Sequence, residues 1–287
     1  MALLYEIDAF EVSGVIDREL SEWTPDNLRR AFLRYGCAIV RRAAPAGLLD
    51  QVRGAIDEAY KHTTDVHVYD RDIKVITERA LTGYEIVGDP KLKRFLDLVY
   101  SGQWYLRKNA TARRIEGTDR DQGWQEPLPL HLDAQIHRFQ FTVNFWVPLQ
   151  DCGIDAPTLQ FVPLDYIRTR DYSGFTGRPL RSKEDFHLAY FSKDAFELDS
   201  IHAAFGENCL LRPAMKAGDL VIASNWFIHG SYRTPAMTKG RTSIELRFLG
   251  TDLDIAPYLK PFPRRLMSVV SGRASTNFAR CSPRQIQ

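Results

Sequence analysis

The residues best suited to chemistry lie in two segments far apart in the chain. His131 and Asp133 are two residues apart in EPLPLHLDAQIHRF, and His229 lies in GDLVIASNWFIHGSYRT. On an extended chain, residues i and i+2 point to the same side, so an imidazole and a carboxylate can reach one ion together. Two histidines and one carboxylate on one face of an ion leave the other face open, as in iron(II) oxygenases. We therefore expect His131, Asp133 and His229 to hold iron(II).

Two further residues support this expectation, because a His-x-Asp pair alone is also typical of a surface turn with local hydrogen bonds. Arg241 follows His229 by twelve residues, at the head of the alternating segment GRTSIELRF. A guanidinium binds a carboxylate through two parallel hydrogen bonds, so Arg241 suits a dicarboxylate co-substrate. Ser231 can add a hydroxyl donor to the same carboxylate. Arg247 shares a strand face with Arg241 and is the alternative for this role.

The segment 139–147 alternates and is rich in aromatic and β-branched residues, which predicts a strand. If its polar face points inward, Asn144 lies in the co-substrate pocket; a cross-strand hydrogen bond is an equal alternative. A basic cluster precedes this strand and suits either a solvated face or an anionic ligand; it comprises Arg107, Lys108, Arg113 and Arg114.

These motifs resemble the phytanoyl-CoA hydroxylase-like (PhyH) family of iron(II)/2-oxoglutarate-dependent dioxygenases. The likeness covers roughly residues 100 to 250, through HLDAQ, FTVNFWVPLQDCGIDAPTLQFVP, GDLVIASNWFIHGSYRT and GRTSIELRF. It implies a double-stranded β-helix, a metal triad of His131, Asp133 and His229, and binding of 2-oxoglutarate by Arg241 and Ser231.

The resemblance also implies a reaction. Dioxygen and 2-oxoglutarate would be consumed and succinate and carbon dioxide released while a C–H bond of a small molecule is hydroxylated. Related halogenases have Gly or Ala where this chain has Asp133, so hydroxylation, desaturation or ring closure is favoured over halogenation. Two alternatives stay open: an oxygenase that modifies peptides or proteins, and a cupin-like binding protein without catalysis.

The order of elements predicts an α+β protein in which helices precede a jelly-roll body. After a first strand within residues 1–12, helices are expected from Pro25 to Tyr35, from Pro45 to Tyr60 and from Pro90 to Tyr100. A short strand at 37–40 separates the first two helices. Further strands are expected at 104–115, 158–162, 220–223 and 242–248.

Residues 165–205 are polar and weakly patterned, which predicts a lid over the site, where Arg or Lys would hold an anionic group of the substrate. We expect one domain over residues 1–287: a helical lead-in at 1–100, a β-helix core at about 101–250 and an extension at 251–287.

Composition narrows the class of partner. The formal charge of +2, from 38 basic and 36 acidic residues, favours neither nucleic acid nor a membrane surface. No apolar run is long enough to cross a bilayer, and the N-terminus lacks a basic signal-peptide region. The four cysteines are widely spaced, without a CxxC pair, so neither a disulfide framework nor a zinc ribbon is expected. These features predict a cytoplasmic protein that binds neither nucleic acid nor a membrane; the small-molecule substrate is what the family resemblance implies.

Overall fold

The computed structural model describes residues 15–61, 68–69, 89–101, 104–106, 111–115, 117, 127–131, 133, 142–163, 198–225 and 228–250. The expected first strand within residues 1–12, most of the expected lid and the extension at 251–287 lie outside these residues. Within the expected lid range, the structure has one helix, α9 (Leu198–Phe205), followed by the 3-10 helix η2 (Glu207–Cys209). No helix in the described part is both long and apolar enough to span a membrane.

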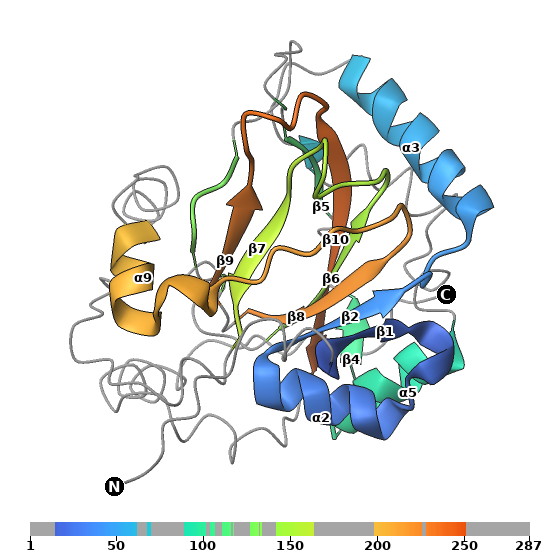
Figure 1. Ribbon diagram of the computed structural model, residues 1–287. Helices are drawn as coiled ribbons and strands as arrows, with labels where there is room; N and C mark the ends of the chain where they lie inside the picture. The colour runs from blue at the N-terminus through green and yellow to red at the C-terminus, as the bar shows by residue number, and fades with distance from the viewer. Residues whose placement is uncertain are drawn as a thin grey trace, which may run out of the picture.

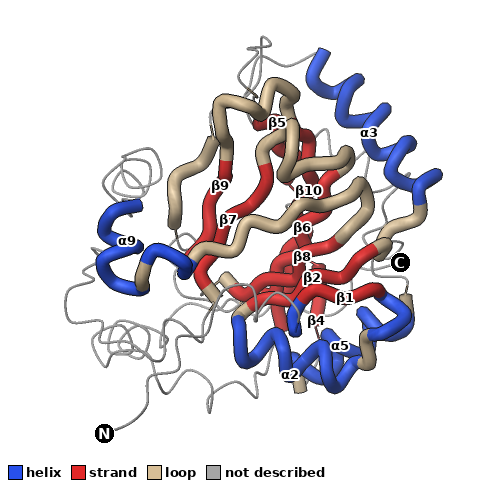
Figure 2. Tube along the Cα trace, viewed as in Figure 1, coloured by secondary structure: helices blue, strands red, loops and turns tan. Residues whose placement is uncertain are grey.

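Two sheets of unequal size form the body of the protein. The larger has eight strands in the order β1-β2-β8-β6-β10-β5-β3, with β4 also paired to β10, and the smaller pairs β7 with β9. In Figure 1 the strands of the large sheet lie between the β7–β9 pair and helix α3 (Ala46–Lys61), and Figure 2 shows the strands of both sheets in red in the same view. The large sheet comprises β1 (Asp17–Glu19), β2 (Cys37–Arg41), β3 (Val68–Tyr69), β4 (Trp104–Leu106), β5 (Thr111–Ile115), β6 (Val143–Pro148), β8 (Leu220–Ser224) and β10 (Arg241–Gly250); the small one comprises β7 (Thr158–Val162) and β9 (Ile228–Tyr232).

This architecture confirms the predicted sheet-dominated α+β class and the jelly-roll body. Strands β5, β6, β7, β8 and β10 lie where alternation and β-branched residues predicted them. Strand β9, which carries His229, was not predicted, because IHGSY contains a glycine and two polar residues and lacks a strand pattern.

The predicted helices are present and end close to the predicted residues. Helix α2 (Pro25–Tyr35) begins at Thr24, whose hydroxyl accepts from the Asn27 amide, and ends at Gly36, whose left-handed backbone has φ 75°. Helices α3 (Ala46–Lys61) and α5 (Pro90–Val99) follow. The 3-10 helix η1 (Leu20–Glu22) connects β1 to α2.

The outer face of the large sheet packs on helices α2 and α5. Phe95 of α5 lies edge-on to Phe32 of α2 and stacks on Phe145 of β6, with ring centroids 5.4 and 6.5 Å apart. Phe145 in turn contacts Phe248 of β10 at 4.8 Å. Even-numbered residues of β10 therefore face the helices, and odd-numbered residues face the space between the two sheets.

Strand pairing carries this alternation to the neighbouring strands. Residue 243 of β10 opposes Arg113 of β5, and residues 245 and 247 oppose Trp146 and Asn144 of β6. Directly opposed residues share a face, so these three side chains also belong to the inner face. Arg114 lies on the outer face, where it pairs with Asp57 of α3.

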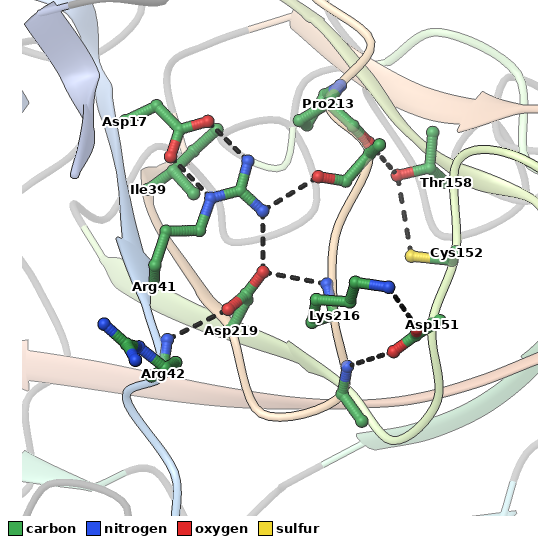
Figure 3. Close-up of polar contacts among 12 residues, drawn as sticks. Asp17, Ile39, Arg41, Arg42, Asp151, Cys152, Thr158, Pro213, Lys216 and Asp219 are labelled. Atoms are coloured by element: carbon green, nitrogen blue, oxygen red, sulfur yellow. Dashed lines mark hydrogen bonds and ion pairs between the residues drawn. The ribbon is translucent and has the colours of Figure 1, made fainter. Parts of the chain in front are cut away.

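An ion-pair network fixes the edge of the large sheet (Figure 3). Arg41 of β2 bonds to Asp17 of β1 and, at 2.6 Å, to Asp219 just before β8. Asp219 is 1% exposed and also accepts from the backbone amides of Arg42 and Lys216. Burial lowers the pKa of Arg41, but its two carboxylate partners outweigh this effect and raise it overall. The network joins segments that are far apart in the chain.

Candidate metal centre

The structure brings His131, Asp133 and His229 together. Each side chain offers one ligand atom, and these atoms all lie within 4.8 Å of one another. His131 Nε2 is 3.5 Å from Asp133 Oδ1, and His229 Nε2 is 3.9 Å from Asp133 Oδ2. The imidazole rings of His131 and His229 have centroids 4.3 Å apart. All three residues are largely buried at the inner face.

Backbone pairing positions the two histidines. The amide of His131 donates to the carbonyl of His229 at 2.7 Å, and the amide of His229 donates back to His131 at 3.0 Å. Gly230 permits this approach: a Cβ there would lie 2.8 Å from the Pro129 carbonyl oxygen and 2.9 Å from the Leu130 amide nitrogen. The reciprocal backbone hydrogen bonds between these segments therefore place the two imidazoles side by side.

The predicted reason for the pairing of His131 with Asp133 is only half correct. His131 lies in an isolated β-bridge with His229, but Asp133 has helical backbone. The chain leaves the extended conformation within two residues, so strand alternation is not what directs both side chains to one place. The Nδ1 atom of His131 lies 2.8 Å from the Pro129 carbonyl oxygen, which leaves Nε2 directed at Asp133.

The electrostatics suit a cation at this site. Burial alone would raise the pKa of Asp133, but His229, His131 and Arg247 together hold it well below its usual value. Asp133 is therefore a carboxylate at neutral pH. An anionic oxygen beside two imidazole nitrogens is a donor set that divalent first-row metals accept.

Arg241 is the most unusual charge in the interior. It is 1% exposed, and burial lowers its pKa to about 10. Its guanidinium lies over the Trp146 ring, 4.9 Å from the centroid. It also donates a long hydrogen bond of 3.5 Å to the Pro157 carbonyl oxygen. Among the residues that the structure describes, no carboxylate pairs with Arg241.

The other predicted residues lie on the same inner face. Ser231 is 7% exposed, two residues beyond His229 on β9. Asn144 points inward, as its polar strand face predicted, and its amide donates to Asp133 Oδ2 at 2.9 Å. Its predicted contact with a co-substrate stays a prediction.

Neither of the two cluster residues that the structure describes lies on a solvated face. Arg113 occupies the inner face opposite Ser243, and the side chain of Arg114 is only 16% exposed. Arg107 and Lys108 lie outside the described residues.

Glu245 and Arg247 complete the site, and Glu245 was not predicted. Arg247 Nη2 donates to Glu245 Oε2 at 2.9 Å and lies 3.7 Å from Asp133 Oδ2. Burial raises the pKa of Glu245, although nearby Arg247 opposes this shift. The alternation in RTSIELRF contained the signal, because its odd positions are all polar while Ile244, Leu246 and Phe248 are apolar.

Comparison with known proteins shows the fold. No family model matches the chain, and no curated protein matches its sequence. Among solved structures, the non-heme alpha ketoglutarate dependent epimerase SnoN from nogalamycin biosynthesis aligns over 81% of this chain and 84% of its own, at TM-score 0.53 and 16% identity. EctD from S. alaskensis aligns over 82% and 81%, at TM-score 0.53 and 12% identity.

A third solved structure, the non-heme alpha ketoglutarate dependent carbocyclase SnoK, aligns over 79% of this chain and 86% of its own, at TM-score 0.53 and 13% identity. The chain shares its fold with these three proteins. At such identities the likeness shows the fold alone. Any assignment of chemistry must therefore rest on the residues of the site described above.

Proposed function

We propose that this protein is a non-haem iron(II) oxygenase that uses 2-oxoglutarate to oxidise a C–H bond of a small molecule. The observation that carries the proposal is a cluster of two histidines and one carboxylate on the same inner face as a buried arginine, for which the described residues supply no carboxylate partner. A two-histidine, one-carboxylate set with open positions is typical of such enzymes. An anion bound to the buried guanidinium would offset the free-energy cost of burying its charge.

His131, Asp133 and His229 would hold the iron. Bound iron(II), with 2-oxoglutarate and dioxygen, supplies the oxidising chemistry and yields succinate and carbon dioxide. Two structures of the same fold support this choice of cofactors: SnoN in complex with Fe3+, alpha ketoglutarate and nogalamycin RO, and EctD with 2-oxoglutarate and 5-hydroxyectoine.

Arg241 and Ser231 would bind the distal carboxylate of 2-oxoglutarate. A carboxylate that met Arg241 would offset the cost of burying its charge, while Trp146 keeps the guanidinium plane fixed. The inner face of the described strands carries three arginines and one acid, Arg113, Arg241 and Arg247 against Glu245, and Asp133 adds a second acid beside it. This excess of positive charge favours 2-oxoglutarate and a substrate that has an anionic group.

Succinate release tests this function. The purified protein, iron(II) and 2-oxoglutarate would be incubated with a library of free metabolites and, separately, a peptide pool. We expect succinate above the background only with one class of small molecule, and none with Asp133→Ala. The control is Asp155→Asn, a half-buried carboxylate that pairs with Lys239 outside the cluster, and it should retain full activity. Release stimulated only by peptides would overturn the substrate class, and undiminished release by Asp133→Ala would overturn the metal site.

A further inference from the structure

The two oxygens of Asp133 have different surroundings. Oδ2 accepts from the Asn144 amide at 2.9 Å and lies 3.7 Å from Arg247 Nη2. Oδ1 is the oxygen nearer to a histidine nitrogen, at 3.5 Å from His131, whereas the contact of Oδ2 with His229 is 3.9 Å. Each oxygen thus faces one histidine, but the Asn144 amide and the Arg247 guanidinium both contact Oδ2, so Oδ1 is the oxygen left for a metal ion.

We infer that Asn144 and Arg247 engage Oδ2 so that Asp133 offers the metal one oxygen rather than two. The inference rests on the proposed function and assigns Asn144 and Arg247 as positioning residues. A carboxylate can bind one ion through one oxygen or both. If both bound here, they would occupy a position that the chelating 2-oxo acid and dioxygen require.

The amide of Asn144 is held in one orientation. The Thr142 hydroxyl donates to Asn144 Oδ1 at 2.9 Å, so the amide nitrogen faces Asp133. Thr142 is itself fixed by Asn225: its backbone amide donates to Asn225 Oδ1, and its carbonyl accepts from the Asn225 amide. Thr142, Asn144 and Asn225 are at most 3% exposed. This buried chain prevents the amide from turning away from the carboxylate.

Glu245 lets Arg247 lie near a cation site without adding net charge. Arg247 donates to Glu245 at 2.9 Å from the same inner face of β10. The pair is neutral as a unit, so Asp133 keeps its negative charge for the metal. Without Glu245 the guanidinium would repel the ion and compete with it for Asp133.

The test measures metal binding and 2-oxoglutarate binding separately, without turnover. Manganese(II) affinity is measured by calorimetry. Affinity for 2-oxoglutarate is then measured anaerobically on iron(II)-loaded protein, from the visible absorption of the iron chelate. Asn144→Leu removes the donor to Oδ2 at similar volume, and the exposed Asn208→Leu is the matched control.

For Asn144→Leu we expect manganese(II) affinity within about threefold of the wild type and at least a tenfold loss of 2-oxoglutarate affinity. Unchanged binding of both ligands would overturn the inference. A parallel loss of both would also overturn it, because it would show a carboxylate that is merely displaced. If Asn144→Leu does not fold, Thr142→Val carries the same test with a smaller expected loss, about threefold. Wild-type protein that binds neither ligand would instead refute the proposed function.

Discussion

Among single residues, Arg241 carries the most informative charge. Its guanidinium is buried, no carboxylate in the described part of the chain pairs with it, and burial lowers its pKa to about 10. A buried charge in this situation costs stability. A purely structural arginine would be paired, as Arg41 is with Asp17 and Asp219. The exception at Arg241 points to a ligand that supplies the missing anion.

Replacement of Arg241 by methionine should therefore separate stability from function. We expect Arg241→Met to leave the thermal midpoint of the ligand-free protein unchanged or higher, since an unpaired buried charge is removed. The same change should weaken 2-oxoglutarate binding by roughly ten- to a hundredfold, the size of a lost charged hydrogen-bond pair. Differential scanning calorimetry and calorimetric titration measure the two effects. A midpoint lowered by several degrees with normal 2-oxoglutarate binding would show that Arg241 is structural.

The types and spacing of residues predicted which side chains cluster at the candidate site, but not the hydrogen bonds and ion pairs around them. His131, Asp133 and His229 were predicted from spacing and family resemblance, because metal ligands belong to a small set of side chains. The support around Asp133 could not be predicted in the same way. Asn144, Arg247 and Glu245 come together only through the pairing of β6 with β10, and that register depends on the packed core as a whole.

Among the secondary-structure elements, the close contact between β9 and the segment before Asp133 fixes the relative positions of His131 and His229. Helices α2, α3 and α5 were predictable from their caps and apolar spacing, which are local signals. Strand β9 was not, because its extended form comes from pairing with β7 and with His131 rather than from its own residues.

Gly230→Ala tests this contact directly. Its Cβ would meet backbone atoms of Pro129 and Leu130 at less than 3.0 Å, so the two histidine segments must separate. We expect manganese(II) affinity to fall at least tenfold. Gly54→Ala is the matched control: a Cβ there meets nothing within 4 Å in the interior of α3. It should stabilise the protein by about 0.5–1 kcal/mol and leave metal affinity unchanged. Equal metal affinity in both variants would argue against the role of this contact.

A variant of Asp219 tests whether the buried ion-pair network stabilises the large sheet (Figure 3). Asp219→Asn leaves Arg41 with one carboxylate partner and weakens two backbone contacts. We expect a loss of about 3 kcal/mol in the free energy of unfolding in urea. Asp151→Asn breaks the exposed pair with Lys216 and weakens the hydrogen bond from the Ala217 amide, and it should cost less than about 1 kcal/mol because both contacts are exposed. Similar losses in the two variants would contradict a special role for the buried network.

At the scale of the whole molecule, ligands should stabilise the fold. The inner face carries more positive than negative side chains, and metal and 2-oxoglutarate would together satisfy Asp133 and Arg241. Binding to the folded state alone raises stability by about 2.7 kcal/mol at a ligand concentration one hundred times the dissociation constant. We expect the thermal midpoint to rise with manganese(II) and rise further with 2-oxoglutarate. Removal of metal with a chelator should abolish both increases, and a midpoint insensitive to both ligands would contradict the account.

The proposed function requires two histidines and one aspartate, His131, Asp133 and His229, to bind a single metal ion. Anaerobic equilibrium dialysis against iron(II), with the iron counted per chain, tests it most directly. We expect one equivalent in the wild type and in Asp155→Asn, and essentially none in the double variant His131→Ala/His229→Ala. One tightly held equivalent in the double variant, or none in the wild type, would contradict the claim.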